Sequence, residues 1–356
     1  MKLFAYLIPL LFVIGSCKKD VESNPPFEKK YGEGMYIVTD LGVSFYNHKS
    51  STSQVVNHIF NTVNNLIINN PKKIKFRGTK AYILADNYIA TANVKSFENK
   101  GDINNFINPV DLDFVSNDRL FVVDKNDSRV KVVDLERMEI ISDIETGEAA
   151  SPGFIVSNSY KSFILNSGGL SKETKDSTIL VVNYRDNLVP QAIIEGSLLA
   201  GDNPNSAVIS SDGRLKVLCK GIYDPTNSAN NTMSSLSNIN QYNNEIYSTD
   251  NLSGIYNAQN LISNYDNSIC YFTAEGGVYR LDPNTLNVSL ITNTDASVIN
   301  TDVESIAIND STTVYYEMLY MNDNAAPNSL YKYNISLSSF VDTIVVSGNI
   351  RDVSFY

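Results

Sequence analysis

The sequence lacks several of the residues and motifs on which common chemistries depend. It has no tryptophan, two histidines and three cysteines among 356 residues. Two histidines cannot build a three-histidine zinc site, and H-E-x-x-H is absent. G-x-G-x-x-G, the P-loop and the G-x-S-x-G nucleophile elbow are also absent. We therefore expect no catalytic residue, no metal site and no cofactor, which predicts that the protein is not an enzyme.

Positive charge is also scarce. Lys and Arg number 28 against 39 Asp and Glu, so the formal net charge is −11. Nucleic-acid binding needs a basic surface that neutralises phosphates, so we expect no nucleic-acid partner.

Long apolar runs are missing except at the start of the chain. Lys2 precedes the apolar segment Leu3–Ile14, which is shorter than the ~20 residues that span a bilayer. The segment ends in Ile14-Gly15-Ser16-Cys17, which resembles the lipobox of bacterial lipoproteins. This predicts a signal peptide over residues 1–16 and lipidation of Cys17. The alternative is an ordinary signal peptide, or an uncleaved anchor, with a chance cysteine.

The residues after Cys17 are polar and include a Pro-Pro pair, which is typical of a tether. We expect residues 17–33 to join the lipid to a folded domain. Asp20 and Glu22 follow the cysteine closely and are reminiscent of surface-export signals. The predicted location is the outer membrane, with the cell surface favoured over the periplasmic face.

The rest of the chain is organised by a repeat, seen most clearly in Asn108–Ile144. Apolar and polar residues alternate in four short runs, separated by polar turn residues. Four antiparallel strands in ~37 residues form one blade of a β-propeller.

First strands of this repeat recur seven times. They lie at Ile74–Phe76, Asp111–Phe114, Phe154–Val156, Ala207–Ile209, Leu261–Ser263, Ser305–Ile308 and Asp352–Phe355. The last has no blade after it, whereas residues 34–60 (strands predicted at Met35–Val38, Val43–Tyr46 and Gln54–Ile59) lack a first strand. We therefore predict an all-β, seven-bladed β-propeller over residues 34–356, closed by pairing of the C-terminal strand with the N-terminal blade.

Three insertions join the second and third strands of their blades: Asn166–Ser177, Gly221–Met233 and Asn322–Asn328. Such loops lie on the same face of a propeller, where function concentrates on rigid scaffolds. The contact residues that we predict for a ligand or partner are Tyr223, Asp224, Asn322, Asp323 and Asn324.

The remaining cysteines and the histidines favour structural roles. Cys219 and Cys270 lie among apolar neighbours, which is typical of small core residues, with a disulfide as the alternative. His48 is expected in a turn and His58 in a strand. Calcium at Asp124–Ser128 is the less favoured alternative to a plain turn, because the glycine and the distal glutamate of calcium loops are missing.

The segments ILADNYIATANV, LFVVDKNDSRVKVVDLE and GGVYRLDPNTLNVSLIT resemble the YVTN-type, YncE-like propeller lipoproteins of Bacteroidetes. The resemblance covers about residues 34–356. It implies a surface lipoprotein that captures a small nutrient beside a TonB-dependent outer-membrane transporter; cobalamin is the ligand in the best-known case.

Two other functions remain open at this stage. One is a propeller hydrolase or lyase with a metal at the channel mouth. Asp111 and Asp352 occupy matching positions of the repeat, as carboxylates around such a channel would, but the repeat itself explains their recurrence better. The other is a structural subunit of an envelope or secretion complex. The favoured prediction is a non-enzymatic binding protein.

Overall fold

The computed structural model describes residues 30–50, 52–147, 150–158, 161–169, 171–185, 191–309 and 312–356. The predicted signal peptide, Cys17 and most of the tether lie outside these residues. Among the described residues, no helix is both long enough and apolar enough to cross a membrane.

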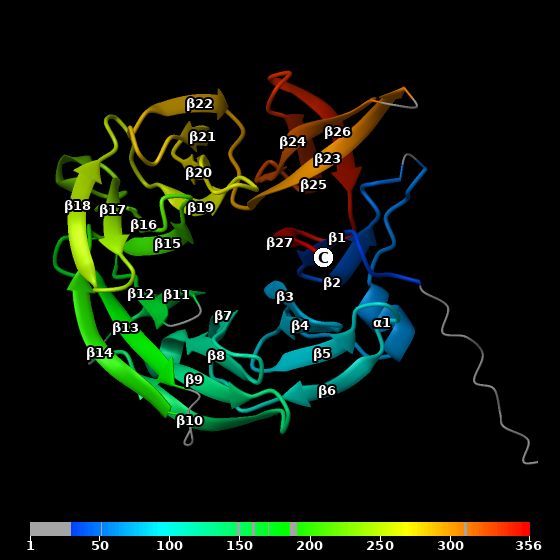
Figure 1. The fold of residues 1–356 in the computed structure, drawn as a ribbon, viewed down its shortest axis with the longest axis horizontal. Helices are drawn as coiled ribbons and strands as arrows, with labels where there is room; N and C mark the ends of the chain where they lie inside the picture. Colours follow the sequence, from blue (N-terminus) through cyan, green and yellow to red (C-terminus); the bar gives the residue numbers. More distant parts are fainter. Residues whose placement is uncertain are drawn as a thin grey trace, which may run out of the picture.

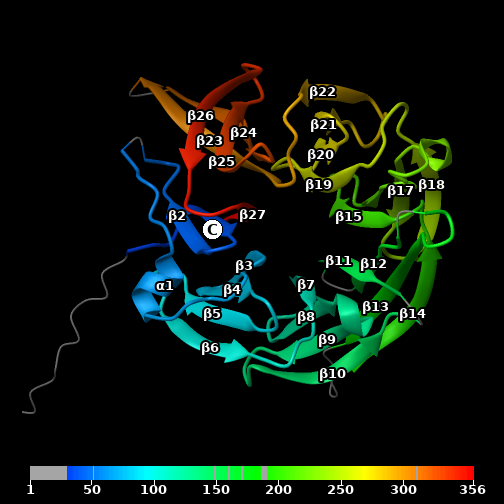
Figure 2. The same cartoon turned by 180° about the vertical axis from the view of Figure 1, so that it is seen from behind.

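Seven antiparallel sheets follow one another around a ring, which Figures 1 and 2 show from opposite sides. Blade 1 consists of β27 (Ile350–Phe355), β1 (Met35–Thr39) and β2 (Gly42–Tyr46); blade 2 of β3 (Lys73–Arg77), β4 (Lys80–Leu84), β5 (Ile89–Asn93) and β6 (Asn99–Ile103). Blade 3 consists of β7 (Pro109–Phe114), β8 (Arg119–Asp124), β9 (Arg129–Asp134) and β10 (Glu139–Glu145); blade 4 of β11 (Pro152–Ser157), β12 (Lys161–Asn166), β13 (Thr178–Arg185) and β14 (Gln191–Leu199). Blade 5 consists of β15 (Pro204–Ile209), β16 (Leu215–Cys219), β17 (Ser235–Asn240) and β18 (Glu245–Asn251); blade 6 of β19 (Gln259–Ser263), β20 (Cys270–Ala274), β21 (Gly277–Leu281) and β22 (Val288–Thr292). Blade 7 consists of β23 (Ile299–Asn309), β24 (Thr312–Asp323), β25 (Ala326–Asn334) and β26 (Ser339–Val345). The predicted seven-bladed β-propeller is confirmed.

The ring closes where the sequence predicts. β27 pairs antiparallel with β1, with Phe355 opposite Met35 and Val353 opposite Ile37. Val353 is 2% exposed, so this closure buries apolar surface as well as satisfying the edge of β1. The two ends of the propeller are thereby held in one sheet.

Seven hydrophobic clusters among the described residues each join two neighbouring blades. The alternation along β8 shows how this works: Leu120 and Val122 pack toward blade 2, whereas Phe121 and Val123 pack toward blade 4. Both faces of an inner strand are thus covered, which explains why such strands are continuously apolar. No blade buries its own core without its neighbours.

The prediction of a fourth strand for blade 1 at Gln54–Ile59 is wrong. Val56 forms a single bridge with Phe45, and then helix α1 (Ile59–Asn64) begins. His58 has a positive φ of 53° that ends the extended run. Ile59 and Phe60 are both buried, and a helix start accommodates two consecutive buried side chains that strand alternation would separate. His58 therefore lies at a helix start rather than in a strand.

Candidate functional site

The meander of each blade divides the connections between two faces of the ring. The link face, as we call it, carries the connections between blades and the turns from second to third strands. The hairpin face carries the turns from first to second and from third to fourth strands. The predicted insertions belong to the link face, as expected.

Two of the three insertions are extended loops, but the third is not. β24 continues to Asp323 and β25 begins at Ala326, so only Asn324 and Ala325 form the turn. Asp323 pairs with Ala326 next to a bulge, and its carboxylate accepts a hydrogen bond from Ala325 N at 2.9 Å. Polar residues that suggested a loop here extend a bulged hairpin instead.

The two extended loops are joined by Asn203, a residue that the sequence did not single out. Its side chain is buried; Oδ1 accepts hydrogen bonds from Gly168 N at 3.1 Å and Asp176 N at 3.2 Å. Nδ2 donates to the carbonyls of Gly169 at 3.1 Å and Gly221 at 2.9 Å. One amide therefore holds the blade 4 loop against the start of the blade 5 loop.

The predicted residues Tyr223 and Asp224 line a link-face cavity of about 380 Å³ between blades 5 and 6. Its other lining residues are Pro225, Ser228, Asn231, Tyr256 and Glu275. The Tyr223 hydroxyl donates to Glu275 Oε1 at 3.0 Å, and that hydrogen bond raises the pKa of Tyr223. A tyrosine, a carboxylate and an amide thus meet at one opening.

Asp224 stiffens the wall of this cavity. Its Oδ1 accepts hydrogen bonds from Thr226 Oγ1 at 2.6 Å and from Asn227 N at 3.1 Å. Its own backbone N donates to Asn231 Oδ1 at 2.7 Å. The hydrogen bonds from Thr226 hold the pKa of Asp224 below its ordinary value, so the carboxylate stays ionised and the loop stays closed on itself.

Asn322, Asp323 and Asn324 lie apart from that cavity, in blade 7. The Asn322 side chain is buried, and its Oδ1 accepts hydrogen bonds from Ser297 N and Val298 N, both at 2.9 Å. Asp124 does the same in blade 3, where its carboxylate accepts from Ile107 N and Asn108 N at 2.7 Å. The end of a second strand thus secures the link that enters its own blade.

The innermost strands carry paired charges. Lys73 Nζ lies 2.6 Å from Asp111 Oδ1, and Lys75 Nζ lies 3.0 Å from Asp113 Oδ1. Asp111 also accepts a hydrogen bond from Ile155 N at 3.0 Å, just as Asp352 accepts from Ile74 N at 2.9 Å. The carboxylates of the repeat therefore tie first strands of different blades together, and no group of three metal-ligating side chains occurs in the described part of the chain.

A hairpin-face cavity of about 480 Å³ between blades 1 and 7 holds titratable groups that the sequence did not connect. His48 Nε2 lies 2.6 Å from Asp302 Oδ2. Glu304 accepts hydrogen bonds from Lys332 Nζ at 2.5 Å and from the Tyr320 hydroxyl. His48 and Asp302 are 254 positions apart, and closure of the ring brings them together. Glu304, Tyr320 and Lys332 all belong to the sheet of blade 7.

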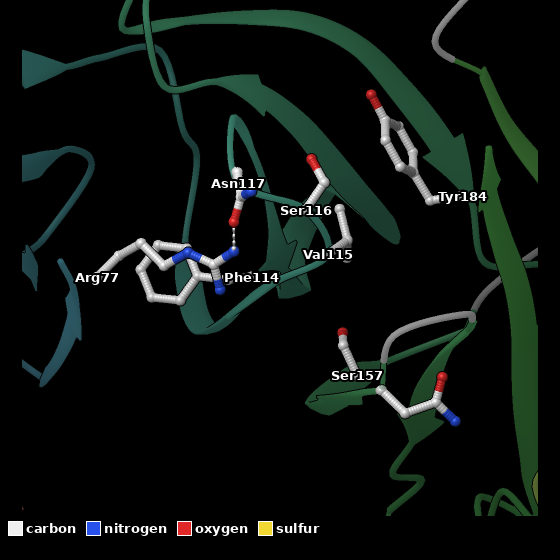
Figure 3. A pocket seen from close by; sticks show the side chains of 8 residues that line it. Arg77, Phe114, Val115, Ser116, Asn117, Ser157 and Tyr184 are labelled. Carbon is white, nitrogen blue, oxygen red and sulfur yellow. Dashed lines mark hydrogen bonds between the residues drawn. The ribbon is translucent and has the colours of Figure 1, made fainter. Parts of the chain in front are cut away.

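A second hairpin-face cavity, of about 510 Å³, lies between blades 2, 3 and 4 (Figure 3). Its lining residues are Arg77, Phe114, Val115, Ser116, Asn117, Ser157, Asn158 and Tyr184. Arg77 lies over the Phe114 ring, 5.4 Å from its centroid, and donates to Asn117 Oδ1 at 2.6 Å. Most of the residues that line this cavity lie in, or directly before, the short turns between the first and second strands of their blades.

Comparison with solved structures identifies the fold but not a family. A protein from Bacteroides uniformis, described as a candidate 6-phosphogluconolactonase, superposes with a TM-score of 0.65 at 12% identity over 91% of this chain and 99% of that one. Its counterpart from Bacteroides fragilis gives a TM-score of 0.64 at 9% identity over 93% and 99%. The periplasmic gluconolactonase of Pseudomonas aeruginosa gives 0.62 at 12% identity over 91% and 98%.

The shared feature is the bacterial seven-bladed propeller. No family model matches the chain, and no curated protein does. The resemblance to YncE-like lipoproteins is therefore supported at the level of fold, and the narrower assignment stays a prediction.

The prediction that the protein is not an enzyme requires correction. Structures named as lactonases are built on the same ring of blades, so missing sequence motifs do not exclude an enzyme. The reason is physical: a propeller brings catalytic groups together from separate blades, and no short motif records such a site.

Proposed function

We propose that this protein is a lipid-anchored propeller of the bacterial outer membrane that captures a small polar molecule on its link face, beside a TonB-dependent transporter. The observation that carries the proposal is the cavity between Tyr223 and Glu275, whose wall is ordered before any ligand arrives. Hydrogen bonds within the Asp224 loop fix its conformation in the free protein. Binding therefore loses less conformational entropy than it would with a flexible loop.

The chemistry of the cavity favours a ligand rich in hydroxyl groups. Tyr223 and Tyr256 offer amphipathic rings, and Tyr256 is 36% exposed. Glu275 and Asn231 add an acceptor and an amide. The carboxylate of Glu275 at this opening favours a neutral molecule with donors over an anion.

Anchoring and transporter partnership rest on the sequence. The lipobox-like segment ending at Cys17 and the polar tether up to residue 33 support a domain held near a membrane. The link face would then present its cavity to a transporter whose substrate it concentrates.

Titration calorimetry with cyanocobalamin and a panel of neutral oligosaccharides tests capture. We expect one probe to bind and Tyr223→Ala to weaken its binding at least tenfold, because the ring and the hydroxyl are both lost. Tyr265→Ala is the matched control, because Tyr265 is 75% exposed in a turn on the opposite, hairpin face. This variant should bind the probe as tightly as the unchanged protein does. Capture at this cavity is refuted if no probe binds or if Tyr223→Ala binds equally well.

A second candidate function is hydrolysis of a lactone in the His48 cavity. It is favoured by the His48–Asp302 pair, in which Asp302 holds one ring nitrogen, and by the named lactonases of the same fold. The other ring nitrogen, Nδ1, is buried without a hydrogen-bond partner, so it can act as a base only when water reaches it from the cavity. It would then take a proton from the water that attacks the lactone carbonyl and return it to the ring oxygen as the C–O bond breaks to give the hydroxy acid.

Proton release from glucono-δ-lactone, measured by pH-stat against the spontaneous rate, tests this second function. We expect His48→Gln to lose at least tenfold of the enzyme-dependent rate and His58→Gln, at the start of α1, to retain it. A rate equal to that of buffer alone would rule out this substrate class.

A further inference from the structure

We infer that the hairpin-face cavity beside Arg77 binds an oxyanion, the carboxylate or phosphate group of a small molecule. This site is separate from the proposed capture site, because it lies on the opposite face and uses other blades. Figure 3 shows Arg77, Phe114 and Asn117 on one side of the cavity, with Tyr184 and Ser157 across from them.

The guanidinium of Arg77 is held in a fixed plane. It lies over the Phe114 ring, and one of its amino groups donates to Asn117 Oδ1 at 2.6 Å. A planar guanidinium has five N–H donors, so further donors remain for a ligand in a fork that matches a carboxylate or phosphate. Asn117 and Phe114 thus orient the donor group before binding.

The charge around the site favours an anion. No carboxylate of the described residues forms an ion pair with Arg77, although the whole chain carries 39 acidic residues. Asp113, close by on β7, is paired with Lys75, and Asp118 is paired with Arg119 at 2.7 Å. Arg77 also lines a neighbouring cavity together with Asp118 and Glu136. Neither carboxylate forms an ion pair with its guanidinium, so the positive charge remains available for a ligand.

The remaining lining is neutral and of suitable size. Val115 and Phe114 provide apolar wall, and none of the eight lining residues is acidic. The polar side chains of Ser116, Ser157 and Asn158 already form hydrogen bonds with Asp118, Ser162 and Gln241, so Arg77 is the donor that the ligand would use. The volume of about 510 Å³ is in the range of small-molecule sites. We assign the site to a small organic acid or phosphate ester, with the oxyanion at Arg77 and the rest of the molecule toward Tyr184.

Three probes that differ at a single position test the assignment: glucuronate, glucose 6-phosphate and glucose. The titrations use Tyr223→Ala, in which the proposed capture site for hydroxyl-rich molecules is disabled. We expect calorimetry to show binding of one or both anions and none of glucose, with binding weakened between 50 and 500 mM NaCl. Binding of glucuronate alone would identify a carboxylate site, and binding of glucose 6-phosphate alone a phosphate site. If neither anion binds, or if glucose binds equally well, the inference is wrong.

Variants place the binding at Arg77. Arg77→Gln should weaken anion binding at least tenfold, and Arg77→Lys should retain part of it, because the charge survives but the fork is lost. Arg137→Gln is the matched control: Arg137 lies on the same face but near Asp134 and Glu139, and its variant should bind normally. Normal binding by Arg77→Gln would overturn the inference.

A second substitution tests the site even if the Arg77 variants do not fold. Asn117→Asp keeps Arg77 but places a carboxylate against it, so the folded protein should lose anion binding. Tyr223→Ala should bind the anions normally, which separates this site from the capture site. Retained anion binding in folded Asn117→Asp would also contradict the assignment.

Discussion

Asn203 shows how one buried side chain positions two functional loops. Its amide makes four hydrogen bonds to backbone atoms of the blade 4 and blade 5 loops. Its backbone also has a positive φ of 56°, which asparagine tolerates better than most residues. The sequence could not reveal this role, because every partner is a backbone atom brought close by folding.

We predict that Asn203→Ala lowers the free energy of unfolding by about 2–4 kcal/mol, because buried backbone groups lose their partners. Urea unfolding measures the change. Asn267→Ala is the matched control, because Asn267 has a φ of 58° but is exposed in a turn. This substitution should lower the free energy of unfolding by less than about 1 kcal/mol. Equal losses in the two variants would mean that the backbone conformation, not the hydrogen bonds, is decisive.

The two core cysteines were predicted correctly as small apolar residues. Cys219 packs between blades 4 and 5 and Cys270 between blades 5 and 6, and both thiols are free. Burial raises the pKa of each thiol to about 12. At neutral pH both therefore stay protonated and unreactive.

We predict that neither thiol of a Cys17→Ala chain reacts with 5,5′-dithiobis(2-nitrobenzoate) in the native state at pH 8. Because the pKa values are raised, the thiolate forms only as the pH approaches about 12. Two thiols should react once guanidinium chloride unfolds the chain. Rapid native reaction at pH 8 would show that the interfaces between these blades open readily.

At the scale of elements, the seven first strands were predictable because alternation and turn residues are local signals. The errors fall where tertiary contacts override them. Gln54–Ile59 became a bridge and a helix start because Ile59 and Phe60 are both buried. Asn322–Asn328 became a bulged hairpin because the long strands β24 and β25 continue to pair beyond the turn signal.

Strand β27 is the element on which the ring depends. We predict that a chain ending at Gly348 loses cooperative unfolding or associates, because the edge of β1 becomes free and the buried Val353 and Ile350 are lost. Thermal unfolding followed by circular dichroism, together with size-exclusion chromatography, measures both effects. Tyr356→Ala should remain monomeric and cooperative, since its backbone pairing with Gly34 survives. A stable monomer after truncation would mean that the other six blades suffice.

At the scale of the whole molecule, the proposed anchor precedes the propeller in the sequence. Lipid chains contribute ~0.8 kcal/mol per buried CH₂, so two or three chains hold a protein on a membrane. The folded domain itself contributes no membrane-spanning helix among its described residues.

The proposed anchor predicts that Cys17→Ala moves the protein from the membrane pellet to the soluble fraction in the native host. Lys18→Ala, which keeps the cysteine, should stay in the pellet. Mass spectrometry of the mature N-terminus should show an acylated Cys17. Recovery of Cys17→Ala in the pellet, unextracted by high salt, would contradict lipid anchoring.

The sequence by itself determined the all-β class, the seven repeats and the closure of the ring, because strand alternation and turn chemistry are encoded within a few residues. It also placed Tyr223 and Asp224 on the face where their cavity lies. Only the tertiary structure decided that His48 meets Asp302 and that Arg77 faces a cavity shared by three blades. These contacts depend on the angle at which neighbouring blades pack. That angle is set by the seven buried interfaces together and not by any single segment.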